Sequence, residues 1–128
     1  MPFVGLAMAT WLVEGSREAQ AVFALLAYGA TILSFLGAIH WGLALRDPGH
    51  PPAVMLVWGV LPSLVAWAAL LWGDGPGLCL LAAGLWACWF VDRSVYPRFG
   101  LQGWLAMRLI LTAIASLSCV GAAVRALQ

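Results

Sequence analysis

Three ionisable side chains lie inside long apolar stretches of this sequence and are the first candidates for chemistry. They are His40, Asp92 and Arg108. Because a titratable or charged group is costly in apolar surroundings, such residues are often functional. A base, an acid and a permanent cation could together bind an anionic head group or a quinone, or could pass protons along. The alternative, which we favour, is structural: an ion pair that locks two helices, with a histidine bonded to a carbonyl.

The three residues are predicted to lie at one depth. His40 lies shortly before Arg46, Asp92 lies shortly before Pro97, and Arg108 lies two turns inside the last apolar stretch. At 1.5 Å of helical rise per residue, each would sit roughly 7 to 12 Å from the same end of the molecule. We therefore predict an ion pair between Asp92 and Arg108.

Trp41 follows His40 directly, so the functional interpretation places Trp41 in the same pocket as His40, Asp92 and Arg108.

The sequence offers few other candidate sites for a ligand or a metal. Haem ligation by two histidines would need His50, which lies in a loop beside two prolines, and we do not expect it. No metal site is predicted, because the three cysteines have no ligand spacing and are interpreted as packing residues: Cys79, Cys88 and Cys119. No cofactor can be named.

The composition determines the class of protein. Of 128 residues, 64% are hydrophobic and only 9% are charged, and the net charge is +1. A soluble domain of this size needs more polar surface than that. Three cysteines do not suit a disulfide scaffold, and no basic cluster is present to bind nucleic acid. The sequence therefore predicts an integral membrane protein whose main partner is the lipid bilayer.

Five apolar segments predict an all-α bundle of five transmembrane helices, in a single domain covering 1–128. Short loops make successive helices antiparallel neighbours. A span needs about 20 residues, and four segments meet that length. The first is short or clipped, which indicates a short or tilted helix, an interfacial stub, or a native start that lies upstream. The predicted spans are about 2–13, 19–45, 53–72, 78–95 and 101–124.

Two features predict how the helices pack. The second segment carries small residues four apart, a pattern typical of close helix contact in membranes, with the same chain or with a second copy. In the third segment, Pro62 removes a backbone donor and predicts a kink, next to the hydroxyl of Ser63. The small residues are Ala30, Ser34, Ala38 and Gly42, with Gly29 and Gly37 on adjoining rows.

The arginines indicate an orientation. Three lie beyond one end of the predicted bundle, and two lie at the other: Arg46, Arg93 and Arg98, against Arg17 and Arg125. Because cytoplasmic loops carry the excess of positive charge, the first end and the N-terminus are predicted to be cytoplasmic.

Several stretches are distinctive enough to show a resemblance. Residues 28–42 read YGATILSFLGAIHWG and residues 61–67 read LPSLVAW, and Asp92, Trp104 and Arg108 follow in order. This pattern resembles a domain-of-unknown-function family of small polytopic inner-membrane proteins that includes the mitochondrial transmembrane protein 69. The resemblance covers nearly the whole chain. It implies a bacterial inner-membrane or mitochondrial protein of five helices, with a first helix longer than 2–13. The resemblance implies no particular biochemical activity.

Two hypotheses on function follow. The first is a non-catalytic accessory, assembly or scaffold component that packs against itself, as a homo-oligomer, or against a larger membrane complex. The alternative is a binder or carrier of a small lipid-soluble or ionic ligand (a quinone, a lipid head group or a proton) at the level of His40, Asp92 and Arg108. A membrane enzyme is the least favoured interpretation, because no nucleophile–base pair or metal set is apparent.

Overall fold

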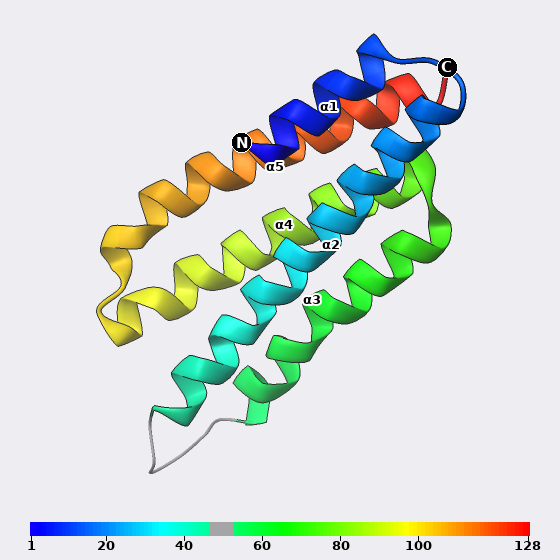
Figure 1. Ribbon diagram of the computed structural model, residues 1–128. Helices are drawn as coiled ribbons and strands as arrows, with labels where there is room; N and C mark the ends of the chain where they lie inside the picture. Colours follow the sequence, from blue (N-terminus) through cyan, green and yellow to red (C-terminus); the bar gives the residue numbers. More distant parts are fainter. Residues whose placement is uncertain (47–52) are drawn as a thin grey trace.

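The computed structural model describes residues 1–46 and 53–128, and within them it confirms the predicted helical membrane bundle (Figure 1). Two short 3₁₀ turns connect the last two α-helices. The elements are α1 (Pro2–Leu12), α2 (Ser16–Leu45), α3 (Ala53–Trp72), α4 (Asp74–Val95), η1 (Tyr96–Phe99), η2 (Gln102–Trp104) and α5 (Leu105–Ala126).

Successive long helices run antiparallel, α2 and α4 pack parallel to each other, and α1 packs between α2 and α5 along one half of the bundle (Figure 1). Each of α2 to α5 is long and apolar enough to cross a membrane. The 11 residues of α1 extend only about 16 Å, roughly half the hydrocarbon thickness. Helix α1 therefore separates α2 from α5 over part of their length only.

Helix α4 begins at Asp74, four residues before the predicted start of its span at 78. Gly73 has a φ of 64°, so that one residue reverses the chain between α3 and α4. Pro76 then lies in the first turn of α4, where its missing N–H removes no helical hydrogen bond. The glycines and proline of 73–77, which lie between the predicted spans 53–72 and 78–95, thus belong mostly to the helix.

The tight contact of α2 is made with α3 of the same chain. A Cβ placed on Gly37 would lie 2.5 Å from the carbonyl oxygen of Gly59, so the two backbones touch there. The indole of Trp41 packs over Gly59, and its Nε1 donates to the carbonyl of Leu56 at 2.7 Å. Trp41 therefore joins α2 to α3.

In the predicted row of small residues on α2, some residues are buried in the bundle and others are exposed on its surface. Ala30 is buried, and Ser34 is half-buried and bonds to the Ala30 carbonyl at 2.9 Å. Ala38 and Gly42 are exposed. The adjoining row makes the internal contacts instead, because Gly37 faces α3 and Gly29 faces Leu81 of α4.

Pro62 lies in the middle of α3 with its ring against Gly37, and the helix continues through it. A proline deprives the carbonyl four residues earlier, here that of Trp58, of its helical partner. The Ser63 hydroxyl donates to the carbonyl of Val60 at 2.7 Å rather than to that carbonyl. Ser63 therefore does not replace the bond that Pro62 removes.

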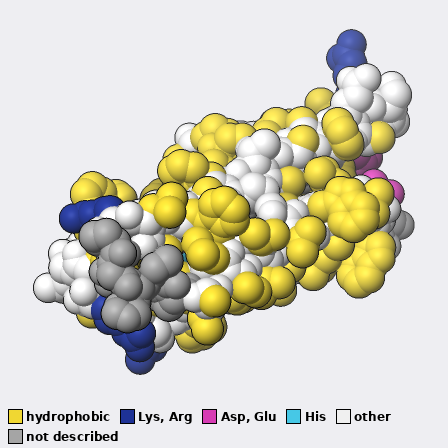
Figure 2. All heavy atoms as spheres, turned by 90° about the horizontal axis from the view of Figure 1, so that it is seen from below, with side chains coloured by type: hydrophobic (Ala, Val, Ile, Leu, Met, Phe, Trp, Pro, Cys, Tyr) yellow, Lys and Arg dark blue, Asp and Glu magenta, His cyan; other side chains and the backbone are white. Residues whose placement is uncertain are grey.

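The outer surface suits a lipid environment. Figure 2 shows one face of the bundle, with hydrophobic side chains spread along its length and charged side chains at its two ends. Helix α3 contributes many of the exposed apolar groups, for example Val54, Leu64 and Trp67. An apolar belt between two charged ends is the arrangement that a bilayer-spanning bundle requires.

Candidate functional site

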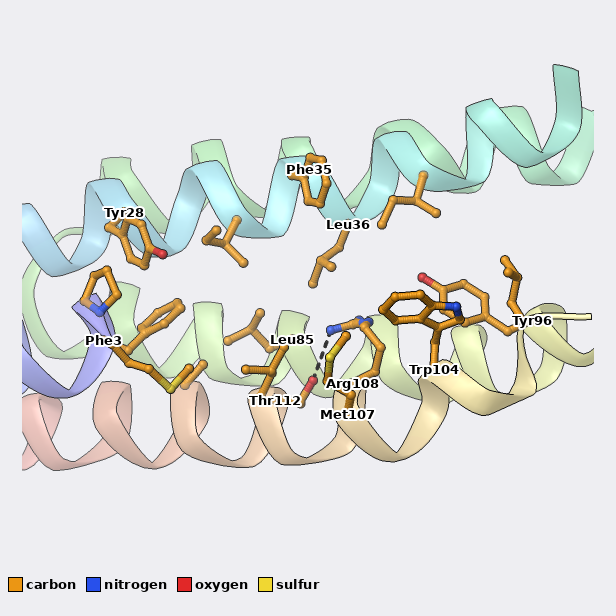
Figure 3. A pocket seen from close by; sticks show the side chains of 17 residues that line it. Phe3, Tyr28, Phe35, Leu36, Leu85, Tyr96, Trp104, Met107, Arg108 and Thr112 are labelled. Atoms are coloured by element: carbon orange, nitrogen blue, oxygen red, sulfur yellow. Dashed lines mark hydrogen bonds between the residues drawn. The ribbon is translucent and has the colours of Figure 1, made fainter. Parts of the chain in front are cut away.

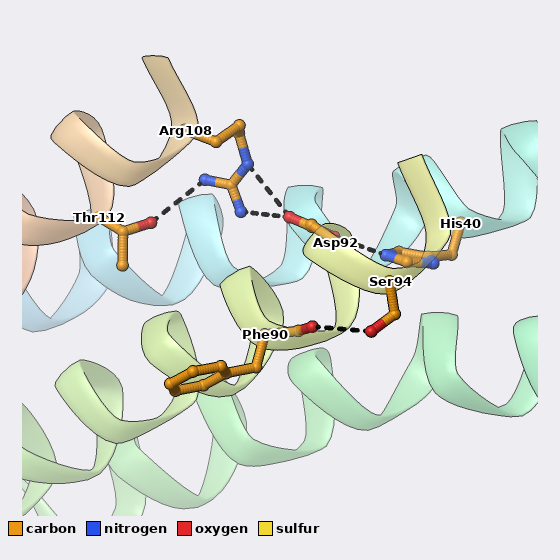
Figure 4. A network of polar contacts seen from close by, with 6 residues as sticks. All are labelled: His40, Phe90, Asp92, Ser94, Arg108 and Thr112. Atoms are coloured by element: carbon orange, nitrogen blue, oxygen red, sulfur yellow. Dashed lines mark hydrogen bonds and ion pairs between the residues drawn. The ribbon is translucent and has the colours of Figure 1, made fainter. Parts of the chain in front are cut away.

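Asp92 of α4 is fully buried and bonds to two other helices (Figure 4). Its Oδ1 lies 2.8 Å from Nε2 of His40 on α2. Its Oδ2 accepts from Nε and Nη2 of Arg108 on α5, at 3.1 and 2.5 Å. Both carboxylate oxygens are thus occupied, and one side chain links α2, α4 and α5.

The hydrogen bond to Asp92 places a proton on one nitrogen of the His40 ring. A carboxylate only accepts, so Nε2 of His40 donates, and the other ring nitrogen is Nδ1. That Nδ1 is buried without a partner among residues 1–46 and 53–128, as is Nε1 of Trp58. The rings of Trp58 and Tyr96 both lie near the His40 ring, with centroids 6.4 and 6.3 Å away. These aromatic neighbours thus help to hold the imidazole in place.

Among His40, Asp92 and Arg108, it is Arg108 that has unused hydrogen-bond donors. A guanidinium carries five N–H groups. Two are bonded to Asp92 and one, on Nη1, to the Thr112 hydroxyl at 3.5 Å. The Tyr96 hydroxyl also lies close to the guanidinium, and the other two N–H groups have no further acceptor in the described part of the chain. Arg108 is therefore held firmly by Asp92 while part of its hydrogen-bonding capacity stays unused.

A cavity of about 600 Å³ lies beside Arg108, between α2 and α5 and next to the N-terminal end of α1 (Figure 3). Its walls are almost entirely apolar. Because Phe35, Trp104 and Met107 are strongly exposed, this cavity reaches the outer surface that faces lipid. The lining residues are Met1, Pro2, Phe3, Tyr28, Ile32, Phe35, Leu36, Ile39, Leu85, Tyr96, Leu101, Trp104, Met107, Arg108, Leu111, Thr112 and Ala115. We call it the α2/α5 pocket.

The structure brings together three of the four residues in the predicted cluster. His40, Asp92 and Arg108 meet, and the expected ion pair between Asp92 and Arg108 is present. Trp41 points to α3 and takes no part in the cluster. His50 lies outside the described residues.

The α2/α5 pocket was not predicted from the sequence. One signal could have indicated it: the first apolar segment is too short to cover both of its neighbours along their whole length. Tyr96 and Trp104, at the end of the pocket near Arg108, come from the turns between α4 and α5. Turn residues rarely show from sequence alone that they line a cavity.

Comparisons with known proteins place the chain in a family. It is 36% identical to transmembrane protein 69 of Xenopus tropicalis over 114 residues, which are 85% of this chain and 44% of that protein. It is 43% identical to transmembrane protein 69 of Mus musculus over 51 residues, which are 38% of this chain and 21% of that protein. The chain thus spans less than half the length of these relatives. No solved structure matches it. A family described as "Protein of unknown function (DUF3429)" matches residues 1–124, and the chain belongs to that family.

Proposed function

We propose that this multi-pass membrane protein binds a small lipid-soluble molecule in the α2/α5 pocket and has no catalytic step of its own. One observation carries the proposal: a largely apolar cavity has Arg108 in its wall, and Asp92 fixes that arginine. Ligand sites are typically cavities of about 300–1,000 Å³, mostly apolar, with a few placed polar groups. At about 600 Å³ the α2/α5 pocket has that size and that character.

The polar cluster supports the proposal by holding Arg108 in place before a ligand arrives. A free arginine side chain loses considerable conformational entropy when it is immobilised against a ligand. Here Asp92 and Thr112 already bind the guanidinium, and His40 in turn binds Asp92. The structural and functional interpretations of the cluster are therefore compatible, since the ion pair that joins α4 to α5 also positions the donor.

Replacement of Leu111 by tryptophan tests the pocket directly. Leu111 lines the pocket and is half-buried, so a larger side chain there would occupy the space of a ligand. We expect the wild-type protein, purified in mild detergent, to retain a lipid-soluble molecule in native mass spectrometry. Leu111→Trp should retain it about tenfold less, a loss of about 1.4 kcal/mol in binding.

Leu109→Trp is the matched control, because Leu109 lies on the same helix, is exposed and does not line the pocket. This variant should retain the molecule as the wild type does. Equal retention by all three proteins, or none by the wild type, would contradict binding in this pocket.

A second candidate function is an accessory or assembly role, through packing against a second copy or a larger membrane complex. Two small residues of α2, Ala38 and Gly42, remain on its outer surface, and a Cβ on Gly42 would meet nothing within 4 Å. Such positions let another helix approach closely.

If Ala38 and Gly42 mediate self-association, Gly42→Leu should convert a dimer to a monomer, as measured by light scattering in detergent. Gly121→Leu, also at an open position, should not. A wild-type protein that is monomeric and purifies alone would exclude this role.

We also propose a bacterial inner membrane as the location, with the end that carries Arg46, Arg93 and Arg98 in the cytoplasm. The surplus of arginine at that end supports this orientation. Helix α1 packs antiparallel to α2, so its N-terminal end points to the same side.

A further inference from the structure

We propose that the α2/α5 pocket selects a neutral ligand that presents a carbonyl oxygen to Arg108 and Thr112 and carries a long hydrocarbon tail, as quinones do. This inference rests on the proposed function and specifies its ligand. Three observations support it: the type of hydrogen-bonding group in the wall, the balance of charge, and the shape of the pocket.

The polar part of the wall mainly donates hydrogen bonds. Arg108 has two N–H groups beyond those bonded to Asp92 and Thr112, with only the Tyr96 hydroxyl close to the guanidinium, and it cannot accept. Thr112 accepts from Arg108, and its own hydroxyl proton has no acceptor among the described residues. A ligand that only donates would leave these groups unsatisfied in an apolar cavity, at a cost of about 1–3 kcal/mol each. The ligand should therefore bring an acceptor, and a carbonyl oxygen can accept two hydrogen bonds.

The charges in the wall are already balanced. The Asp92 carboxylate and the Arg108 guanidinium are in contact, with 0% and 11% of their side chains exposed, and their charges cancel. An anionic ligand beside Arg108 would add a second negative charge close to Asp92 without a second cation. In a low-dielectric site an uncompensated charge is strongly disfavoured. The pocket should therefore prefer a neutral acceptor to a carboxylate or a phosphate.

The pocket is elongated, with Arg108 between two groups of aromatic side chains (Figure 3). Tyr96 and Trp104 lie on one side of it, and Phe3 and Tyr28 lie toward α1 on the other. A flat ring could pack beside Tyr96 and Trp104 with its carbonyl at Arg108. The apolar part toward Phe3 then holds a tail, which can leave between α2 and α5 past Phe35 into the lipid.

A neutral carbonyl with a long tail could come from two sources, an isoprenoid quinone or the ester of a neutral glycerolipid. Binding of four probes to the purified full chain, measured by native mass spectrometry, distinguishes them: decylubiquinone, dioleoylglycerol, oleate and hexadecane. We expect one or both carbonyl probes to bind at least about tenfold tighter than ionised oleate and hexadecane. The tighter of the two identifies the source.

Thr112→Val removes one donor and keeps the shape of the side chain. It should weaken binding of the preferred carbonyl probe by about threefold to tenfold, the effect of one hydrogen bond, and leave hexadecane binding unchanged. Unchanged hexadecane binding also shows that the variant is folded. Thr31→Val, at an exposed threonine of α2 that does not line the pocket, should change neither affinity.

The outcomes separate this inference from the proposed function. If hexadecane binds as tightly as the carbonyl probes and Leu111→Trp abolishes its binding, the pocket binds lipid-soluble molecules but does not select a carbonyl. Tighter binding of oleate would likewise overturn the selection of a neutral ligand while the site itself stands. If no probe binds the wild type, both the proposed function and this inference fail.

Discussion

Replacement of Arg108 by leucine is expected to lower the free energy of unfolding by about 3–5 kcal/mol, the typical cost of leaving a buried charge without its partner. Asp92 is fully buried, and Arg108 provides two of its three hydrogen bonds. His40 alone would then face the carboxylate. Denaturation with SDS in mixed micelles, followed by tryptophan fluorescence, measures the change.

A double-mutant cycle shows whether the loss comes from the ion pair. Adding Asp92→Asn to Arg108→Leu removes the unpaired charge, so the double variant should recover part of the lost stability. Arg98→Leu is the control, because Arg98 is exposed and should change stability by no more than about 0.5 kcal/mol. Strictly additive effects of the two buried substitutions would mean that Asp92 and Arg108 do not interact.

The sequence predicted this cluster because helical rise is constant. Once an arginine or a proline marks the end of a span, counting residues from that end gives the depth of a side chain in the bundle. His40, Asp92 and Arg108 have the same predicted depth. Depth does not give direction around the helix axis. His40 and Trp41 are adjacent in sequence, so their side chains point about 100° apart. With His40 turned to α4, Trp41 turns to α3.

The pattern of small residues shows a similar limit. Spacing of four along α2 fits two neighbouring rows, and the sequence of α2 alone cannot say which row faces α3. That depends on the partner, because Gly59 of α3 lets the backbones touch at Gly37. The α2/α5 pocket was still harder to predict. The pocket depends on where α1 lies relative to α2 and α5. The pattern of residues within a single segment does not indicate that position.

Replacement of Gly37 by valine is the second substitution with a large expected effect, a loss of about 3 kcal/mol in the free energy of unfolding. Even a single carbon at this position would come within 2.5 Å of the Gly59 carbonyl oxygen and close to the ring of Pro62. Both belong to the middle of α3 and cannot rotate away as a side chain could, so the helices must separate. Overpacking in a well-filled core typically costs about 1–3 kcal/mol, and a collision with backbone belongs at the upper end of that range. The same SDS denaturation measures it.

Gly121→Val is the matched control, because a Cβ on Gly121 meets nothing within 4 Å. The comparison also separates packing from helix propensity. Glycine is among the weakest helix formers, so on propensity alone either substitution would stabilise its helix by a few tenths of a kcal/mol. Gly121→Val should show that small gain or no change, while Gly37→Val shows a large loss. Equal stability of the two variants would mean that α2 and α3 do not approach each other at Gly37.

Separating α2 from α3 would also break the hydrogen bond from Trp41 to the Leu56 carbonyl. A shift in the tryptophan emission of the folded Gly37→Val variant should therefore accompany its loss of stability.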